Sequence, residues 1–428
     1  MITSPAFAGR RYAVLGLARS GLATVEALTA SGAEVVAWDS REEARAKVSV
    51  PLADPLAIEL SGYYGVVASP GVPLNTHPIA ARAKAAGVPV IGDIELFAQA
   101  RADLPPHKVV GITGTNGKST TTALVHHILK TAGVPTTMGG NIGLPILAQD
   151  PLPEGGVYVL ELSSYQIDLT SSFDCEVAVL LNVTPDHLDR YDDFEAYRAS
   201  KIRLFEMQSR KHRAIYHFDA DEAEFVLGAR GGDAGGYWFT ADRVGHLLHQ
   251  ANWPALQGPH NALNAAAAIM ACHALGVPDV AIAEGLRTYP GLPHRMERIG
   301  EKRGILFVND SKATNPDSTA PALAAYPRVH WIVGGRAKSE ALGPCADQLD
   351  HVRAAYTIGE AGPMFARLLE DRVPVRQSGM LERAVRDAAA AAVAGEVVLL
   401  SPACASFDQF TDYEARGQAF RDAVGALA

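Results

Sequence analysis

The sequence of 428 residues has few cysteines, no long apolar run and no excess of positive charge. Its four cysteines are scattered and include no C-x-x-C pair, which argues against a disulfide framework and a cysteine-based metal site. No apolar run approaches the roughly 18 residues that span a bilayer, and the N-terminus lacks a basic start followed by an apolar core. The 38 basic residues are outnumbered by 47 acidic ones. We therefore expect a cytoplasmic protein without membrane insertion or general nucleic-acid binding.

The chain is long enough for two to four domains, at roughly 150 residues per domain. Short apolar strands alternate with helical stretches throughout, which predicts α/β architecture with largely parallel sheets. A proline-containing stretch at 103–107 and the glycine and proline near 291–297 mark two boundaries. The predicted domains cover 1–105, 106–293 and 294–428.

Polar or glycine-rich residues follow most of the predicted strands. The predicted strands are 12–15, 34–38, 66–68, 88–91, 157–160, 177–181, 305–308, 330–333, 356–358 and 397–400. In open parallel sheets, ligands bind beyond the carboxyl ends of the strands. We therefore expect the functional residues at these strand ends.

The stretch GITGTNGKSTTT, residues 111–122, predicts an ATP site. It lies between an apolar strand and a predicted helix over 121–129, so that backbone N–H groups and a helix start face an anion. Lys118 can reach the terminal phosphates, and the Ser119 hydroxyl can bind Mg²⁺. Ile112 stands where the usual spacing has its first glycine, and a tight turn that merely contains a lysine is the alternative. We call the following residues the phosphate loop: Gly114, Thr115, Asn116, Gly117, Lys118, Ser119 and Thr120.

Two further strand ends carry candidate metal ligands. Glu161 follows four apolar residues, which suits a partner of Mg²⁺ or water, although it could instead cap a helix at Ser163 or Ser164. The next strand end carries hard oxygen donors and one imidazole, which suit Mg²⁺ or Mn²⁺ but also an ordinary turn. Its polar residues are Asn182, Thr184, Asp186, His187 and Asp189.

Three other features have weaker implications. Lys201, in a helical stretch, is by its spacing a solvated surface residue. Asn261 and Asn264, three residues apart, could share a helix face and contact a base or ribose, or could cap the helix. The string GLARSG with Asp39 after it is a weak dinucleotide-binding motif in a Rossmann-like βαβ unit.

Several strings together resemble the Mur ligase family, nearly from end to end. They are GLARSG, GITGTNGKST, ELSSYQ, NVTPDHLDRY, HNALNA, LPHRME, NDSKATNPDS and SPACASFDQF. The strings ELSSYQ and NVTPDHLDRY contain the candidate metal ligands described above. The strings NDSKATNPDS and SPACASFDQF resemble the family members that add D-glutamate. The resemblance implies an N-terminal Rossmann-like domain for a UDP-muramoyl substrate, a central P-loop ATPase domain, and a C-terminal Rossmann-like domain for the amino acid. It also implies a monomer that takes part in peptidoglycan synthesis.

The implied reaction is ATP-dependent amide formation through an acyl phosphate, with UDP-N-acetylmuramoyl-L-alanine and D-glutamate as substrates and two Mg²⁺ ions, or Mn²⁺, as cofactors. The implied catalytic residues are Lys118, Glu161, His187, Lys201 and Lys338. Ser119, Glu161, His187 and a carbamylated Lys201 would bind metal. Besides the phosphate loop, Asn264, Arg295 and Asp310 would contact the nucleotide. Residues toward the two substrates would be Arg19, Ser20, Asp39, Ser40, Gly71, Asn141, Lys312, Thr314, Lys338, Ser406 and Tyr413.

The chain departs from the family pattern at three places. Tyr413 stands where phenylalanine is expected, Arg336 where related chains often carry aspartate, and Arg19-Ser20 where an apolar residue and threonine are expected. Another Mur-type or folylpolyglutamate synthase-like ligase remains an alternative, although the latter should not need a uridine-binding domain before the phosphate loop. A regulatory P-loop ATPase and a nicotinamide dehydrogenase are further alternatives.

Overall fold

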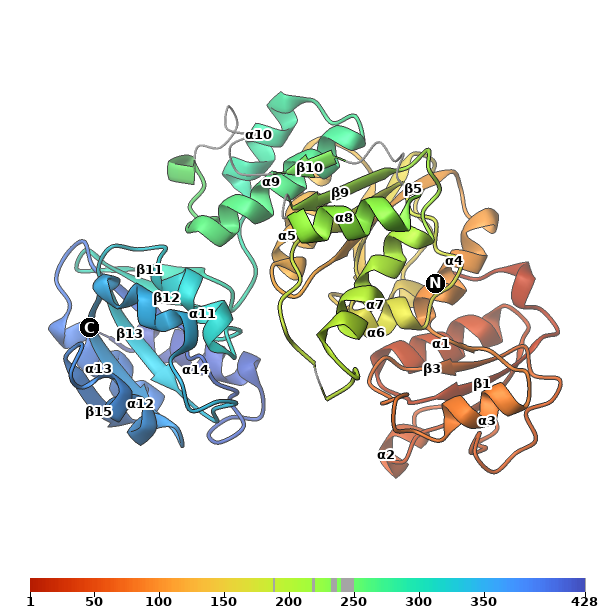
Figure 1. Cartoon of the computed structure of the whole chain (residues 1–428), viewed down its shortest axis with the longest axis horizontal. Coiled ribbons are helices and arrows are strands. Elements are labelled where there is room, and N and C mark those ends of the chain that lie inside the picture. Colours follow the sequence, from red (N-terminus) through yellow and green to blue (C-terminus); the bar gives the residue numbers. More distant parts are fainter. Residues whose placement is uncertain (188, 218–219, 232–236, 240–249, 428) are drawn as a thin grey trace. The chain divides into compact units, whose positions relative to one another are not determined.

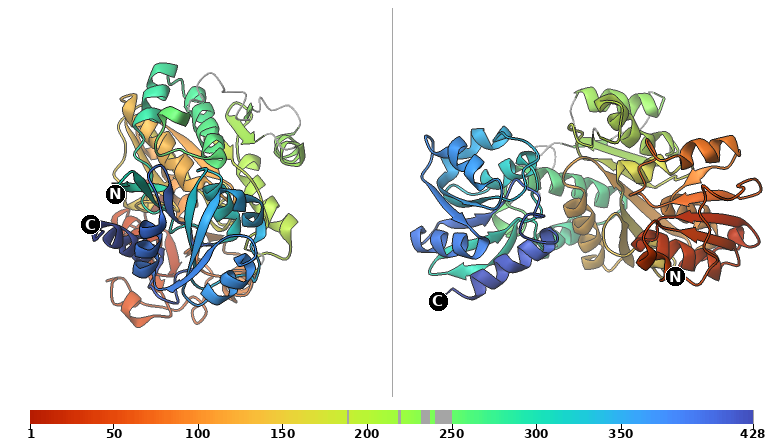
Figure 2. Two further views of the ribbon diagram at one scale, coloured as in Figure 1. Left: turned by 90° about the vertical axis from the view of Figure 1, so that its left-hand side faces the viewer. Right: turned by 90° about the horizontal axis from the view of Figure 1, so that it is seen from below.

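A computed structural model describes residues 1–187, 189–217, 220–231, 237–239 and 250–427. The chain forms two compact units (Figures 1 and 2). The first comprises Met1–Val244 with Ala266–Gly285, and the second comprises Gly245–Ala265 with Leu286–Ala428. The first unit contains two parallel sheets and the second contains one mixed sheet.

The N-terminal sheet of the first unit has the parallel order β2-β1-β3-β4. Its strands are β1 Arg11–Leu15, β2 Glu34–Trp38, β3 Gly65–Ala68 and β4 Val90–Ile91. Its helical segments are η1 Pro5–Phe7, α1 Arg19–Ala30, α2 Glu42–Arg45, α3 Ile79–Ala85, α4 Asp93–Ala100 and η2 Arg101–Asp103. The start of α1 packs so closely on the preceding turn that a Cβ on Gly21 would lie 1.9 Å from the Gly16 carbonyl oxygen.

The second sheet of this unit is also parallel, in the order β10-β9-β8-β5-β7-β6. Its strands are β5 His107–Thr113, β6 Thr136–Gly140, β7 Gly156–Glu161, β8 Val177–Leu180, β9 Arg213–His217 and β10 Tyr237–Phe239. Its helical segments are α5 Lys118–Thr131, η3 Ile146–Ala148, α6 Ser164–Asp168, α7 Phe194–Glu206, α8 Ala220–Ala229 and α10 Asp279–Thr288. One apolar cluster contains buried residues of both sheets, for example Val14 and Val109, so the two sheets share a core.

The sheet of the second unit has the order β11-β12-β16-β13-β14-β15, with only β11 antiparallel to its neighbour. Its strands are β11 Glu297–Lys302, β12 Ile305–Asn309, β13 Val329–Gly334, β14 Val352–Ile358, β15 Val375–Gly379 and β16 Val397–Leu400. Its helical segments are η5 Gln250–Asn252, α11 Pro316–Leu323, η6 Gly343–His351, α12 Gly362–Leu369, α13 Leu381–Ala391 and α14 Tyr413–Gly425. Two apolar clusters, one with residues of α11 and α12 and the other with residues of α13 and α14, include buried residues of the sheet. Helix α9, Pro259–Ala274, contributes residues to both units, and the last three residues of α10 belong to the second unit.

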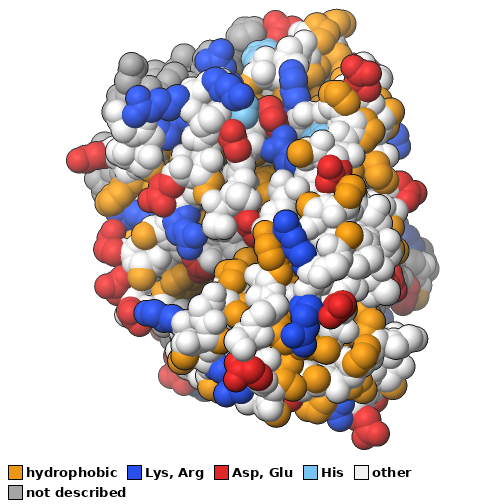
Figure 3. All heavy atoms as spheres, turned by 90° about the vertical axis from the view of Figure 1, so that its right-hand side faces the viewer, with side chains coloured by type: hydrophobic (Ala, Val, Ile, Leu, Met, Phe, Trp, Pro, Cys, Tyr) orange, Lys and Arg blue, Asp and Glu red, His pale blue; other side chains and the backbone are white. Residues whose placement is uncertain are grey.

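The predicted α/β class and parallel sheets are confirmed, and each predicted strand overlaps an observed one. The strands without a prediction, such as β6 and β15, contain glycine or polar residues instead of an apolar run. All four cysteines are buried as free thiols. On the face in Figure 3, basic and acidic side chains are interspersed. Within the described part of the chain, no helix is long and apolar enough to cross a membrane.

Candidate functional site

The phosphate loop connects the central strand β5 to the start of α5, as the sequence predicts. Gly114 and Gly117 both have left-handed φ angles, of +150° and +87°. A Cβ on Gly114 would lie 3.1 Å from the Leu181 Cβ and 3.2 Å from the Asn182 carbonyl oxygen. Glycine is therefore required by both the backbone conformation and the close approach of the next strand end. The resulting turn and helix start suit a phosphate group.

Asn182, at the end of β8, holds the phosphate loop in place. Its side-chain oxygen accepts a hydrogen bond from Asn116 N at 2.9 Å, and its amide nitrogen donates to Asn116 O at 3.1 Å. Its backbone carbonyl accepts from Thr115 N at 2.9 Å. The Thr115 hydroxyl in turn donates to Thr184 O at 3.1 Å. These bonds fix the loop before any ligand binds, so little conformational entropy is lost on binding.

Two lysine side chains meet at one carbonyl of this loop. Lys118 Nζ and Lys201 Nζ donate to Gly114 O at 2.8 and 2.9 Å, and Lys118 also donates to Thr115 O. Lys201 is only 1% exposed. Burial lowers the pKa of Lys201 well below its usual value, and the charge of Lys118 lowers it further. A lysine in this setting has a larger neutral fraction, and the neutral amine is the nucleophilic form.

The prediction of Lys201 as a solvated surface residue is wrong. Lys201 lies on the buried stripe of α7 with Tyr197, four residues before it, and Leu204, three residues after it. Its ammonium lies 4.5 Å from the centre of the Tyr197 ring. The sequence contains the signal, because helical spacing places Lys201 between apolar residues of one face. The reasoning failed because lysine on a helix is usually solvated.

Glu161 ends β7 directly beside β5, with Ile112 as its neighbour in register. Glu161 is 3% exposed, and its Oε1 accepts a hydrogen bond from Asn141 Nδ2 at 3.0 Å. Its Oε2 is buried, and no described residue gives it a hydrogen bond. The helix-capping alternative for Glu161 is wrong, because Ser163 and Gln166 form the capping box of α6. A buried carboxylate oxygen of this kind fits a hard cation such as Mg²⁺.

His187 occupies the loop after β8 in a left-handed conformation, with φ of +55°. Its ring lies 5.2 Å from the Tyr165 ring, centre to centre. Burial lowers the pKa of His187, the neighbouring Asp186 opposes this, and Lys201 and Lys118 lower it further. The neutral imidazole that results is the form that binds metal. Within the described ranges, no three His, Cys, Asp or Glu side chains gather as a metal site. Glu161 and His187 would therefore need other donors, as in the predicted set with Ser119 and a modified Lys201.

Asp39 supports the N-terminal glycine turn instead of facing outward. Its Oδ2 accepts from Leu17 N at 2.7 Å and its Oδ1 from Arg41 N at 2.9 Å. Burial opposes ionisation, but these backbone bonds and the Arg41 guanidinium together lower the pKa of Asp39. Arg19, Ser40 and Gly71 are exposed around the same sheet edge. Arg19 donates to the Gly143 carbonyl at 3.4 Å, in the loop after β6 that also contains Asn141.

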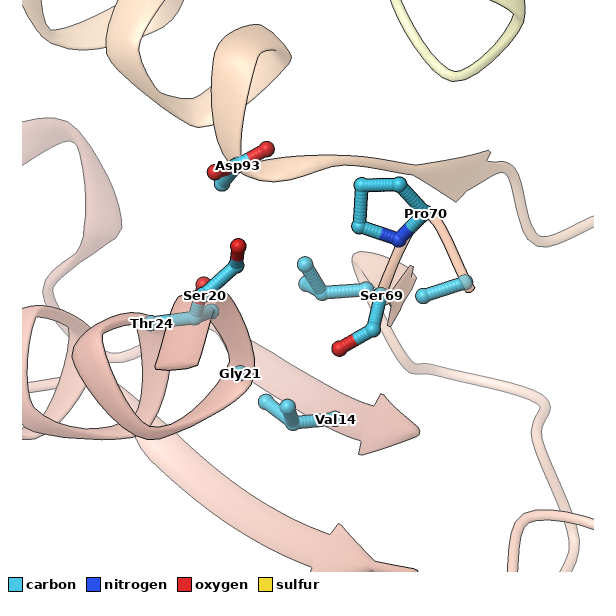
Figure 4. A pocket seen from close by; sticks show the side chains of 9 residues that line it. Val14, Ser20, Gly21, Thr24, Ser69, Pro70 and Asp93 are labelled. Atoms are coloured by element: carbon cyan, nitrogen blue, oxygen red, sulfur yellow. The ribbon is translucent and has the colours of Figure 1, made fainter. Parts of the chain in front are cut away.

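A shallow depression lies beside this turn (Figure 4). The side chains of Ser20, Ser69 and Asp93 border it. Asp93 begins α4 and is 3% exposed. Its Oδ2 is buried, and none of the described residues forms a hydrogen bond with it. Burial raises the pKa of Asp93 to about 6.

In the second unit, several predicted residues gather at the carboxyl end of β12. Asp310 is 7% exposed and accepts from Ser401 Oγ at 2.8 Å and from Met296 N at 3.1 Å. Burial raises the pKa of Asp310 to about 7. Lys312 Nζ lies 3.7 Å from the centre of the Tyr413 ring, so tyrosine at this position provides the aromatic face for a cation–π contact.

His294 and Arg416 also contribute to this edge, and the sequence analysis assigned no role to either. His294 Nδ1 lies 2.9 Å from Asn309 Nδ2, and its carbonyl accepts from Lys312 N at 3.0 Å. Arg416 is 1% exposed and donates to Ser311 O at 2.8 Å and Cys404 O at 3.0 Å. Arg416 thus links the loops after β12 and β16. Arg416 lies in the stretch SPACASFDQFTDYEARG, which resembles the D-glutamate-adding ligases, but its contacts with Ser311 could not be predicted from that stretch.

The remaining predicted residues of this unit lie on neighbouring loops. Ser406 is 2% exposed after β16, while Lys338 is exposed after β13. Arg336 forms an ion pair with Glu360 at 3.2 Å. Thr314 and Arg295 are half-buried. Asn264 Nδ2 donates to Asn261 Oδ1 at 3.1 Å within α9, which confirms that the two share a helix face.

Models of three protein families match the chain in succession. They are the MurD-like N-terminal domain of Mur ligases over residues 10–92, the Mur ligase middle domain over 112–235, and the Mur ligase glutamate ligase domain over 294–404. A UDP-N-acetylmuramoylalanine–D-glutamate ligase of Novosphingobium aromaticivorans is 63% identical over 100% of this chain and 97% of its own. The chain belongs to the Mur ligase family. A ligase of the same name from Zymomonas mobilis is 57% identical, with 100% of both chains covered.

Solved structures show that the fold of this Mur ligase is shared more widely. UDP-N-acetylmuramate-alanine ligase of Thermotoga maritima aligns with a TM-score of 0.59 and 18% identity over 97% of this chain and 99% of that chain. A folylpolyglutamate synthase/dihydrofolate synthase of Yersinia pestis aligns with a TM-score of 0.55 and 20% identity over 77% of this chain and 92% of that chain. Identity at this level shows the three-part α/β fold alone. The folate-type structure leaves about a quarter of this chain unaligned, whereas the Mur ligase structure aligns with nearly all of it.

Proposed function

We propose that this Mur ligase joins D-glutamate to UDP-N-acetylmuramoyl-L-alanine at the expense of ATP, in peptidoglycan precursor synthesis. The observation that carries the proposal is the 63% identity, over the whole chain, to a relative named for this reaction. We assign the UDP-muramoyl substrate to residues 1–105, ATP to 106–293 and D-glutamate to 294–428. The proposed enzyme acts as a cytoplasmic monomer.

In the proposed reaction, the terminal carboxylate of the alanyl group attacks the γ-phosphorus of ATP. ADP leaves, and an acyl phosphate remains. The amine of D-glutamate then attacks the acyl carbon, the C–O bond to phosphate breaks, and the amide forms with loss of one proton. Phosphoryl transfer of this kind depends mainly on positioning and charge neutralisation.

The first unit has the groups that this chemistry needs. The fixed phosphate loop offers backbone N–H groups to the phosphates, and Lys118 offers positive charge at the same turn. Glu161, His187 and Ser119 would bind Mg²⁺, and addition of CO₂ to the neutral Lys201 amine, with loss of one proton, would give a carbamate whose oxygen is a further donor. Bound Mg²⁺ would supply positive charge that offsets repulsion between the carboxylate and ATP. Asn141 would hold the Glu161 carboxylate in its orientation.

The second unit has residues that suit the binding of an acidic amino acid and of part of the nucleotide. Lys312, seated on the Tyr413 ring, and Lys338 supply positive charge, while Thr314 and Ser406 supply hydroxyl groups near the same strand ends. Asn264, Arg295 and Asp310 would contact the adenosine part of ATP. In the first unit, Arg19, Ser20, Ser40 and Gly71 would face the UDP-muramoyl group, and Asp39 would shape the turn that they flank.

The deciding experiment measures the amide product by mass spectrometry. ATP, Mg²⁺ and UDP-N-acetylmuramoyl-L-alanine are incubated with the enzyme and a panel of D- and L-amino acids. We expect product only with D-glutamate. A product with another amino acid would retain the ligase reaction and reject the proposed specificity. ATP hydrolysis without any amide product would favour a folate-type or regulatory role.

A further inference from the structure

The segment after His187 links three parts of the first unit. Arg190 Nη2 donates to Val72 O at 2.9 Å, and Asn75 Nδ2 donates to Asp189 O at 3.1 Å. These bonds connect the segment to the loop after β3. Tyr191, the next residue, turns toward α6 and α7 instead. Residues 189–191 therefore connect the loop after β3 with α7, the helix that contains Lys201.

The Tyr191 hydroxyl bonds to both helices. It donates to Asp168 Oδ2 on α6 at 2.7 Å and lies 3.2 Å from Ser200 Oγ on α7. Ser200 Oγ is also 3.1 Å from Ser164 O. The Tyr191 proton is used by Asp168, so the single Ser200 proton is shared between the Tyr191 oxygen and the Ser164 carbonyl oxygen. Ser200 directly precedes Lys201, and both are buried, at 4% and 1% exposure.

The Tyr191 ring makes a second connection to the same lysine. It lies 5.4 Å from the Tyr197 ring, centre to centre, and the Lys201 ammonium lies 4.5 Å from the centre of the Tyr197 ring. On its other side, Tyr191 stacks with Tyr165 at 6.0 Å. The contribution of the hydroxyl can therefore be tested separately from that of the ring. The substitution Tyr191→Phe keeps the ring and removes only the hydroxyl with its hydrogen bonds.

We propose that Tyr191 is a positioning residue for Lys201. Its hydroxyl fastens residues 189–191 to α6 and α7 and thereby keeps the Lys201 amine at the Gly114 carbonyl of the phosphate loop. This role deepens the proposed function, because the lysine is held where ATP and metal would bind. Asp168 and Ser200 are the partners through which the role is exerted.

The test is the Tyr191→Phe variant of the full chain, with two independent readouts. The first is the rate at which a small acylating reagent, acetic anhydride, labels Lys201, measured by peptide mass spectrometry against the exposed Lys84. We expect Tyr191→Phe to raise Lys201 labelling about fivefold and leave Lys84 unchanged. The second readout is amide formation, where we expect kcat to fall about tenfold, as for loss of a buried hydrogen bond, with the KM for D-glutamate unchanged.

A double-mutant cycle with Ser200→Ala separates positioning from general destabilisation. If both residues act through one network, the double variant will resemble the single ones instead of multiplying their effects. Tyr64→Phe, at a tyrosine that is 40% exposed just before β3, is the matched control and should change neither readout.

Unchanged Lys201 labelling in Tyr191→Phe would overturn the proposal, as would fully multiplicative effects of Tyr191→Phe and Ser200→Ala. If the wild-type chain forms no amide product, the proposed function fails, but the labelling experiment still decides whether Tyr191 positions Lys201.

Discussion

Lys201 is a lysine enclosed by protein, with its amine bonded to a backbone carbonyl and facing a second lysine. Both burial and the neighbouring charge favour its neutral form. An enzyme that needs only positive charge at this position would gain nothing from such surroundings. The environment suits chemical modification of the amine, in agreement with the carbamate that the family resemblance implies.

Replacing Lys201 by alanine should lower the rate of amide formation by at least about 100-fold, since a metal donor and its support are lost. A small carboxylic acid such as acetate should restore part of the rate by occupying the vacated space. Lys84→Ala, on an exposed lysine, is the control and should retain full activity. Near-normal activity of Lys201→Ala would rule out the carbamate role.

Asp93 should make stability depend on pH in a direction opposite to that of a salt-bridged acid. Its pKa is about 6 in the fold and about 3.9 in an unfolded chain, so folding favours the protonated form. The contribution of Asp93 to the free energy of unfolding is greatest below pH 4 and is lost as the pH rises through 6. Asp93→Asn mimics the neutral acid.

We expect Asp93→Asn to gain stability relative to wild type between pH 4 and pH 8, by up to about 3 kcal/mol. Urea unfolding of both proteins across this range measures the difference. A difference that does not change with pH would show that Asp93 stays ionised in the fold.

At the scale of single elements, a glycine without a side chain allows helix α1 to pack closely on the turn before it. Helix α1 starts directly against the turn at Gly16, and the absent side chain of Gly21 makes this possible. The string GLARSG was weak as a sequence motif because glycine is common in turns. In the structure its last glycine lets α1 pack against the turn, which is also one of the roles that glycine has in dinucleotide-binding turns.

Gly21→Ala should destabilise the first unit by on the order of 2 kcal/mol or more, because its methyl group would overlap a backbone oxygen that cannot easily move. The matched control is Gly228→Ala in α8, where a Cβ would meet no described atom within 4 Å. There the change should be neutral or stabilising by up to about 1 kcal/mol, because alanine favours helix. Thermal unfolding of both variants tests this. Equal melting temperatures would contradict the packing role.

The elements that sequence reasoning found are those with contiguous apolar residues. Strands such as β8 and β16 are entirely buried and read as short apolar runs. Strand β11, at a sheet edge with the sequence ERIGEK, has no such pattern and was missed. The phosphate loop was predictable because its glycines and its lysine lie within a few residues of one another in the sequence. The contacts of Tyr191 were not predictable, although it ends the string NVTPDHLDRY, because they depend on how α6 and α7 pack. Arg416 bonds to Ser311, 105 residues away in the sequence.

At the scale of the whole molecule, the residues of the proposed ATP site are already ordered by protein contacts. The phosphate loop, Asn182 and the two lysines form one network of hydrogen bonds. A ligand that binds to the folded chain alone stabilises it by an amount that grows with its concentration. Binding should therefore be visible as a change in stability of the intact protein.

We expect ATP with Mg²⁺ to stabilise the folded chain by about 2.7 kcal/mol at 100 times its Kd. Differential scanning fluorimetry should show the shift, and EDTA should reduce it by removing the metal. Lys118→Ala should reduce it too, whereas Lys84→Ala should not. An equal shift in the Lys118→Ala protein would place ATP elsewhere.

The four buried thiols have a practical consequence for spectroscopy. Burial raises the pKa of Cys175, Cys345 and Cys404 to about 12 and that of Cys272 as well, so few thiolates are available to a maleimide dye. Cysteines introduced at Val280, 77% exposed in the first unit, and Val393, 59% exposed in the second, should therefore react selectively. Energy transfer between dyes at these two positions could follow the separation of the units in solution as each substrate is added, without removing any native cysteine.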